Sequence, residues 1–259
     1  MYNPSIVWIP SEFTMDNFKL AFEKLDYLKT GFVSLWLMEI SAFIEVMVCA
    51  VIAYGFARFE FKEKNIVFFL VLVTIIVPIQ LLGIPMYINF SHFDILGIGK
   101  FFIDTFNLPD FRPNLLNTGL TFWLPSLFGV GVRSGLFIFI YRKFFEGLPR
   151  ELEEAAYVDG AGPLRTFVSV ILPSSGVVFL TVTIFSTIWH WNESYMSDMY
   201  NKLNPPLAVK LDYVRNELQK DSRSAAMAAC LLFVLPMLIM YMILQRKFVQ
   251  SIDRVGIVG

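Results

Sequence analysis

Five long apolar stretches constrain this chain more than any other feature. They cover residues 32–57, 66–90, 121–141, 173–190 and 225–244. A helix needs about 20 predominantly apolar residues to cross a bilayer, and a chain inside lipid must hydrogen-bond all of its own backbone groups. The stretches are too long and too continuous for the strands of a membrane barrel. The sequence therefore predicts an all-α integral membrane protein with five spans.

The composition agrees with a membrane protein. Hydrophobic residues make up 56% of the chain and charged residues 17%, against roughly 25% charged in soluble domains. The net charge of −1 gives no reason to expect a nucleic-acid partner. We expect an outer segment at residues 1–31, a membrane domain at 32–249 with a cytoplasmic loop at 148–166, and a cytoplasmic tail at 250–259.

The basic residues indicate an orientation. Loops 58–65, 142–166 and 246–259 alternate with the regions 1–31, 91–118 and 191–224, and each group carries ten Lys or Arg. The first group is about half as long, and its charges adjoin the ends of the spans. Because short basic loops stay in the cytoplasm, we expect the carboxyl terminus inside and the amino terminus outside.

The outer segment contains a helical pattern of its own. Apolar residues recur with the helical period at Phe18, Ala21, Phe22, Leu25 and Leu28. Thr14 precedes them as a plausible N-cap. The pattern predicts a short amphipathic helix that lies on the outer surface.

One charged stretch interrupts the apolar chain, "ELEEAAYVDGAGPLRTF" at residues 151–167. Three glutamates after Pro149 suit the positive end of a helix dipole. Gly160 can adopt the left-handed conformation of a sharp turn, and Pro163 can begin a second helix. The stretch predicts two short helices joined by a tight bend. On the residues alone, an ordinary surface connection and a functional surface are equally good interpretations.

This stretch resembles the signature loop of permease subunits of bacterial ABC importers, E-A-A-x(3)-G-x(9)-I-x-L-P. The matching positions are Glu154, Ala155, Ala156, Gly160, Val170, Leu172 and Pro173, with valine in place of isoleucine at 170. The segments "IAYGFARFEF", "VPIQLLGIPMY", "WHWNESY" and "LPMLIMYMILQRKFV" resemble the carbohydrate branch of that family, of the maltose-permease second-subunit type.

The resemblance implies that the loop docks on a cytoplasmic ATPase subunit. The residues it assigns to this contact are Glu151, Glu154, Ala155, Ala156, Asp159, Gly160 and Ala161. It further implies a second permease, two ATPase subunits, an extracellular solute-binding protein and a carbohydrate substrate, all assembled at the bacterial inner membrane. The chain has no G-x-x-x-x-G-K-[ST] loop, so ATP is expected on the partner subunits and no cofactor on this one.

The chain departs from the family in three places, one of which is the tail "DRVGIVG", without the usual lysine before the last glycine. The first of the family's six spans is absent, either because the true start lies upstream or because this permease has lost the span. The segment 94–118 is longer than usual.

Charged and aromatic residues in the spans are candidates for a substrate pathway. Glu39, Glu45 and Arg133 should face the protein interior because a charge in lipid is costly. Arg133 could pair with Glu39 or Glu45, or these groups could line a polar route.

Trp191, Asn192 and Glu193, at the end of a span, could contact sugar. The alternatives are an aromatic belt for the tryptophans and helix packing for Asn192 and Glu193. Prolines at 78, 85, 125, 173 and 236 could act as hinges or be merely tolerated.

An enzymatic function is not expected. The chain has two histidines, two cysteines and no C-x-x-C, too few for a metal cluster, and no nucleophile–base pattern is apparent. Two other functions stay open: an ABC permease for a polyamine or a phosphonate, and a secondary transporter or channel that uses Glu39, Glu45 and Arg133 for ion coupling.

Overall fold

The fold is entirely helical within residues 14–95 and 97–256, which a computed structural model describes. No strand occurs in these ranges, as the sequence predicts. The elements are α1 Asp16–Leu25, α2 Tyr27–Ser34, η1 Leu35–Glu39, α3 Ile40–Arg58, α4 Lys64–Ile76, α5 Ile79–Ser91, α6 Ile98–Phe106, α7 Leu120–Leu127, α8 Ser134–Glu146, α9 Glu151–Val158, α10 Pro163–Thr166, η2 Phe167–Ile171, α11 Leu172–Ser174, α12 Gly176–Trp191, α13 Tyr195–Tyr200, α14 Leu207–Asp221 and α15 Arg223–Gly256.

Two of the predicted spans are continuous helices. The stretch 32–57 lies in one helix, Tyr27–Arg58, in which the π-helical segment η1 joins α2 to α3. The stretch 225–244 lies in α15, whose part Arg223–Gln245 is long and apolar enough to cross a membrane. At about 1.5 Å per residue either helix exceeds the roughly 30 Å of a hydrocarbon core.

The other three predicted spans are each divided into shorter helices. The stretch 66–90 bends by 103° between α4 and α5, and the stretch 173–190 belongs to a helix pair that bends by 83° at Ser175. The stretch 121–141 divides into α7 and α8 around residues 128–133.

Extended backbone at Val77 and Pro78 explains the first bend, since proline cannot donate the next helical hydrogen bond. By length and apolarity the described helices allow two crossings, or four if each bent pair is one span. The number of crossings stays a prediction.

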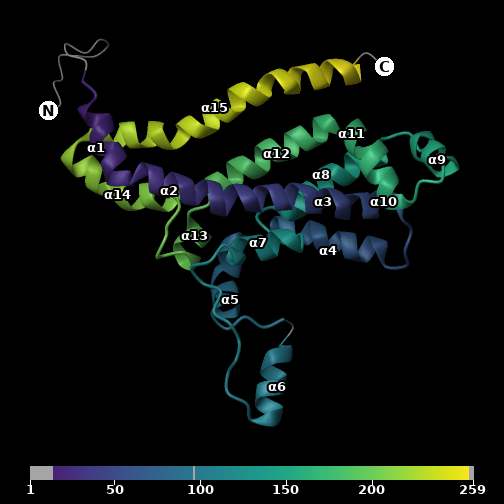
Figure 1. Cartoon of the computed structure of the whole chain (residues 1–259), viewed down its shortest axis with the longest axis horizontal. Coiled ribbons are helices and arrows are strands. Elements are labelled where there is room, and N and C mark those ends of the chain that lie inside the picture. Colours follow the sequence, from purple (N-terminus) through teal and green to yellow (C-terminus); the bar gives the residue numbers. More distant parts are fainter. Residues whose placement is uncertain (1–13, 96, 257–259) are drawn as a thin grey trace.

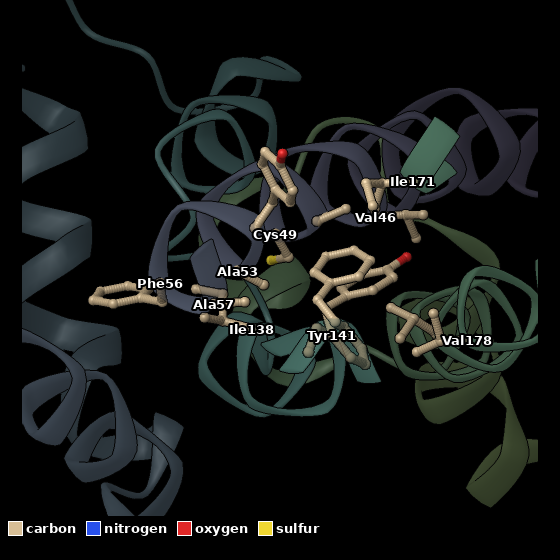
Figure 2. Close-up of a cluster of buried hydrophobic side chains, with 14 of the residues drawn as sticks. Val46, Cys49, Ala53, Phe56, Ala57, Ile138, Tyr141, Ile171 and Val178 are labelled. Atoms are coloured by element: carbon tan, nitrogen blue, oxygen red, sulfur yellow. The ribbon is translucent and has the colours of Figure 1, made fainter. Parts of the chain in front are cut away.

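The main core surrounds α3. Small residues of α3, among them Cys49, Ala50 and Ala53, are fully buried against α8 and α12. Figure 2 shows Ala53 and Ala57 of α3 beside Ile138 and Tyr141 of α8, with Val178 of α12 across from them. Because these α3 side chains are small, the two helix backbones approach closely, as in other membrane helix pairs.

A second core joins the amino-terminal helices to α15. Ala21 and Leu25 of α1 are fully buried with residues of α14 and α15. The predicted helix is therefore present, but it packs on α14 and α15 rather than lying alone on a surface. Thr14 is not the N-cap, because the helix begins at Asp16 after Met15. Its hydroxyl still accepts a hydrogen bond from the Asp16 N–H at 3.1 Å.

The two groups of loops that the sequence distinguishes lie at different ends of the bundle. In Figure 1, α9, the loop between α3 and α4, and the far part of α15 lie at one end of the molecule. Helices α1, α13 and α14 lie at the other end, while α6 projects from the bundle beyond α5 and has no buried residue. The bend of 103° between α4 and α5 precedes this projection in the chain.

Replacing Ala53 by leucine should destabilise the fold, because the larger side chain enters the closely packed contact between α3 and α8. We expect a loss of about 1–3 kcal/mol, measured as a lower midpoint of thermal unfolding of the purified protein in nanodiscs. Val51→Leu is the matched control, since Val51 lies on the same helix and is 50% exposed. Equal midpoints for the two variants would contradict this view of the core.

Candidate functional site

The 148–166 loop forms two short helices with a rigid bend, as predicted. Helix α9 has Glu151, Glu153 and Glu154 in its first turn. Their negative charges interact favourably there with the positive end of the helix dipole. At its end the Gly160 N–H donates to the Tyr157 carbonyl at 3.0 Å, and the Ala161 N–H donates to the Ala156 carbonyl at 2.9 Å. This pair of bonds is a Schellman motif, so hydrogen bonds fix the bend.

Gly160 is the residue that allows this motif. Its φ is +78°, a region that residues with a Cβ enter only at an energetic cost. An added Cβ at Gly160 would meet no atom within 4 Å. The backbone conformation, and not lack of space, therefore requires glycine here, which confirms the prediction of a left-handed turn.

The residues assigned to a partner contact are accessible. Glu151, Glu154, Ala155, Asp159 and Gly160 are exposed, while Ala156 and Ala161 are half-buried. Apolar side chains stand among them: Val158 is 87% exposed and Leu164 is 73% exposed. An exposed mixture of small, acidic and apolar residues on a rigid bend suits a docking surface.

Glu153 is the exception, since it is buried and holds the loop to the bundle. Its carboxylate accepts a hydrogen bond from the Arg58 Nε–H at 2.5 Å and another from the Tyr54 hydroxyl at 3.3 Å. Arg58 also donates to the Leu148 carbonyl at 2.9 Å. The side chains of Arg58 and Glu153 are only 6% and 7% exposed. The end of α3 therefore anchors α9.

Sequence reasoning missed this ion pair. Glu153 reads as one of three glutamates at a helix start, and Arg58 as a basic residue at the end of a span. The pair is separated by 95 residues, so no helical periodicity connects them. An arginine directly after an apolar stretch was the one signal available.

Glu45 belongs to a buried polar network inside the bundle. Its carboxylate accepts hydrogen bonds from the Ser134 hydroxyl at 2.5 Å and the Ser186 hydroxyl at 3.1 Å. The His190 Nδ1 atom lies 3.6 Å from it. Glu45, Ser134, Ser186 and His190 are all almost completely buried, so the network ties α3 to α8 and α12.

Arg133 does not pair with Glu39 or Glu45, so that hypothesis is wrong. Among the described residues, no ion pair within 4.0 Å joins Arg133 to either glutamate. Arg133 is instead an exposed residue before α8, with φ of +66°. Its guanidinium lies 5.9 Å from the centre of the Trp189 ring, within range of a cation–π interaction. The serine hydroxyls around Glu45 take the place of a cation.

The three residues at the carboxyl end of α12 have different environments. Trp191 is buried and donates to the Phe233 carbonyl of α15 at 3.1 Å, so it is neither a sugar platform nor part of an aromatic belt. Asn192 is exposed and donates to the Ile188 carbonyl at 2.7 Å. Glu193 accepts the Met196 N–H at 2.7 Å and so caps α13. Burial raises the pKa of Glu193.

The break between α7 and α8 borders a cavity of about 320 Å³. Residues of α4, α5, α7 and α8 line it, together with His190 and Tyr200. Gly131 leaves room in the break: a Cβ there would come within 2.8 Å of both the Glu45 Oε1 atom and the Ser126 Oγ atom. Irregular backbone in a membrane protein is tolerated where it is buried or lines a cavity. The broken helices thus border an internal cavity.

Glu153→Gln should destabilise the protein, because it leaves the buried Arg58 charge without its partner. We expect a loss of about 3–5 kcal/mol, measured by thermal unfolding in nanodiscs. Joint replacement by Arg58→Met and Glu153→Leu should recover much of it. Glu60→Gln is the control, since Glu60 pairs with Lys64 and its side chain is 80% exposed; it should shift stability by less than about 1 kcal/mol. A similar small effect at Glu153 would rule out the anchoring role.

Sequence comparisons with known proteins give a family match and several relatives. Residues 47–254 match the family described as "Binding-protein-dependent transport system inner membrane component". The "Diacetylchitobiose uptake system permease protein" of Streptomyces coelicolor is 26% identical over 95% of this chain and 75% of its own length. The "Probable starch degradation products transport system permease protein" of Thermoanaerobacterium thermosulfurigenes is 26% identical over 94% of this chain and 81% of its own length.

A solved structure shares the fold. It is titled "Crystal structure of a bacterial ABC transporter involved in the import of the acidic polysaccharide alginate", and one of its chains superimposes with a TM-score of 0.64. The match covers 93% of this chain and 81% of the other at 18% identity. Proteins of this type are transport components of the membrane and not enzymes. With the family match extending over most of its length, the chain belongs to the inner membrane components of binding-protein-dependent transport systems.

Proposed function

We propose that the chain is one of two permease subunits of a bacterial ABC importer for a carbohydrate. The observation that carries the proposal is the exposed bend of the 148–166 loop, which a buried ion pair fixes to the end of α3. The relatives supply the substrate class, since their names concern diacetylchitobiose, starch degradation products and, in a protein 24% identical over 98% of this chain, arabinooligosaccharides. The protein acts in the bacterial inner membrane.

The 148–166 loop is the contact with the ATPase subunits. Ala155 presents a small side chain that lets a partner approach the backbone, while Glu151, Glu154 and Asp159 suit a basic partner surface. Exposed Val158 supplies apolar area. The chain itself carries no phosphate-binding loop. ATP therefore binds the partner subunits, and this subunit provides the surface on which they dock. In this assignment the loop and the carboxyl terminus are cytoplasmic and the amino terminus is outside.

Helix α3 connects the loop to the interior of the membrane domain. Arg58 at its end holds α9, and Glu45, thirteen residues earlier, holds α8 and α12. At about 1.5 Å per residue the two contacts are roughly 20 Å apart along one helix. A displacement of the loop therefore moves the same rigid element that carries the polar network, as alternating access requires.

The remaining partners complete the transporter. A second permease supplies the other half of the pathway, and an extracellular solute-binding protein delivers the sugar. A polyamine substrate is disfavoured because Arg133 is the one charged group among the described residues that line the cavity. A phosphorylated substrate is the second candidate: Arg133 could meet a phosphate, and an sn-glycerol-3-phosphate transport system permease of Pectobacterium atrosepticum is 26% identical over 80% of this chain.

Uptake measurements test the function. The chain is produced with the subunits encoded beside it, and cells are given labelled maltose, diacetylchitobiose, arabinobiose, glycerol 3-phosphate or spermidine. We expect uptake of at least one of the three sugars, abolished by inactivation of the ATPase. Uptake that persists without the ATPase would contradict an ABC importer, and uptake of spermidine alone would contradict the substrate class.

Gly160→Ala tests the role of the bend. The substitution adds only a Cβ, but forcing alanine to a positive φ costs roughly 1–2 kcal/mol and should distort the bend. We expect sugar uptake to fall severalfold while the protein still inserts and ATPase activity becomes poorly coupled to uptake. Gly162→Ala is the matched control, because Gly162 has equally open surroundings and an ordinary φ of −79°. Equal uptake by both variants would argue against a coupling role for the bend.

A further inference from the structure

Helix α6 lies apart from the two cores described above. It has nine residues and none of them is buried, and Figure 1 shows it projecting from the bundle beyond α5. Isolated helices shorter than about 12–15 residues are marginal in water. The stability of α6 therefore depends on contact of one of its faces with something outside the described part of the chain.

Hydrogen bonds nevertheless fix the start of α6 and the base of the projection. The Asp94 carboxylate accepts bonds from the N–H groups of Gly99 and Lys100, each at 2.8 Å, and so satisfies donors of the first turn. At the base, the Leu115 N–H donates to the Phe90 carbonyl at 2.8 Å. Leu115 and Phe90 are both buried, so the projection is rooted in the bundle.

The two faces of α6 differ in chemistry. Ile98, Phe102 and Phe106 recur at intervals of four residues and so share one face, and all three are exposed. Lys100 and Asp104 are exposed as well. At about 100° per residue they lie roughly 160° around the helix from Phe102 and Phe106. The helix is therefore amphipathic, and the described residues leave its apolar face open.

The direction of α6 suits the surface of a bilayer. In Figure 1 its axis runs roughly across that of α3. Helix α3 belongs to the continuous stretch Tyr27–Arg58, which is long and apolar enough to cross a membrane. The change of direction begins in the preceding element, because α5 is bent by 103° from α4. With α3 across the bilayer, α6 lies parallel to its plane.

Exposed apolar side chains also precede α6 in the chain. Leu81, Ile84 and Ile88 occupy one face of α5 and are each more than 60% exposed. Helix α5 belongs to an apolar stretch of the membrane domain, so lipid is the environment that favours such a face. Ile95, between α5 and α6, is exposed in the same way. The apolar face of α6 thus follows a lipid-facing surface.

Charged residues limit how deep α6 can lie. Asp94, Lys100, Asp104, Asp110 and Arg112 lie in it or beside it, and charged groups are costly in the hydrocarbon interior. Full exposure to water would instead leave the aromatic face unburied. The boundary between headgroups and acyl chains satisfies both faces. Three carboxylates against two cations give no attraction to anionic lipid, so apolar area must supply the contact.

We infer that α6 lies in the surface of the bilayer, with Ile98, Phe102 and Phe106 among the acyl chains and Lys100 and Asp104 toward water. In the orientation proposed above, this surface belongs to the outer leaflet. The contact goes beyond the proposed function, because it requires neither an ATPase nor a sugar. It attaches the end of the bent α4–α5 pair to the lipid.

Spin labels on the two faces of α6 test this placement. A nitroxide is attached to Phe102→Cys, Phe106→Cys, Lys100→Cys or Asp104→Cys of the assembled transporter, with every other cysteine replaced by alanine. In vesicles of phosphatidylethanolamine and phosphatidylglycerol, electron paramagnetic resonance measures collisions with oxygen, which concentrates in lipid, and with a nickel chelate, which stays in water. We expect a severalfold higher ratio of oxygen to nickel collisions at 102 and 106 than at 100 and 104.

Three other results would overturn the inference. Frequent nickel collisions at all four positions would place α6 in water. A high oxygen ratio at all four would place it within the hydrocarbon. Low rates with both reagents at positions 102 and 106 would show that a protein, such as the second permease, covers the apolar face.

A paired substitution separates lipid contact from local folding. The label is moved to Ile98→Cys on the same face, and Phe102→Asp is combined with Phe106→Asp. The new charges should expel this face from lipid and lower the ratio at position 98 severalfold. Phe102→Leu with Phe106→Leu is the matched control, because it keeps the face apolar and should leave the ratio unchanged. The same ratio in both pairs would reject the contact with lipid.

Thermal unfolding shows whether the paired substitutions act on the bundle instead. Helix α6 has no buried residue, so both pairs should unfold at the midpoint of the parent protein. A lower midpoint for the aspartate pair, measured in detergent without a bilayer, would mean that these side chains support the fold, and would contradict the inference.

Discussion

The close contact between α3 and α8 is the interaction on which the rest of the structure depends. Cys49, Ala50 and Ala53 present little side chain on the face of α3 toward α8. Lipid offers no hydrophobic gain for bringing two apolar helices together, so packing and hydrogen bonds must supply it. The small residues provide the packing, and Ser134 at the start of α8 provides a hydrogen bond to Glu45. Helices α4, α7 and α12 then pack around this pair.

The break between α7 and α8 is tolerated because protein, and not lipid, surrounds it. A helix interrupted in lipid would expose unpaired backbone groups, yet three apolar stretches are interrupted here. The interruption between α7 and α8 lies against the Glu45 network and borders the cavity. Protein groups therefore replace lipid at the point where the backbone is irregular.

The 148–166 loop shows how a connection can be made stiff. The Schellman bonds fix its bend, and the Arg58–Glu153 pair fixes its position. Both charges are removed from water, so their attraction offsets a desolvation penalty that a surface pair would not have. In the proposed coupling role, a loop held in this way transmits displacement better than a mobile one, and the exposed residues of α9 contact the partner.

The sequence by itself determined the local features. Apolar stretches predict helices, Gly160 and Pro163 predict the bend, and the signature positions from Glu154 to Pro173 indicate the family, because each depends on residues near one another in the chain. Only the tertiary structure decided which distant residues meet. It replaced an ion pair of Arg133 by serine contacts to Glu45, turned Trp191 toward α15, and paired Arg58 with Glu153. These contacts depend on how broken helices pack, and no periodicity of the sequence encodes that packing.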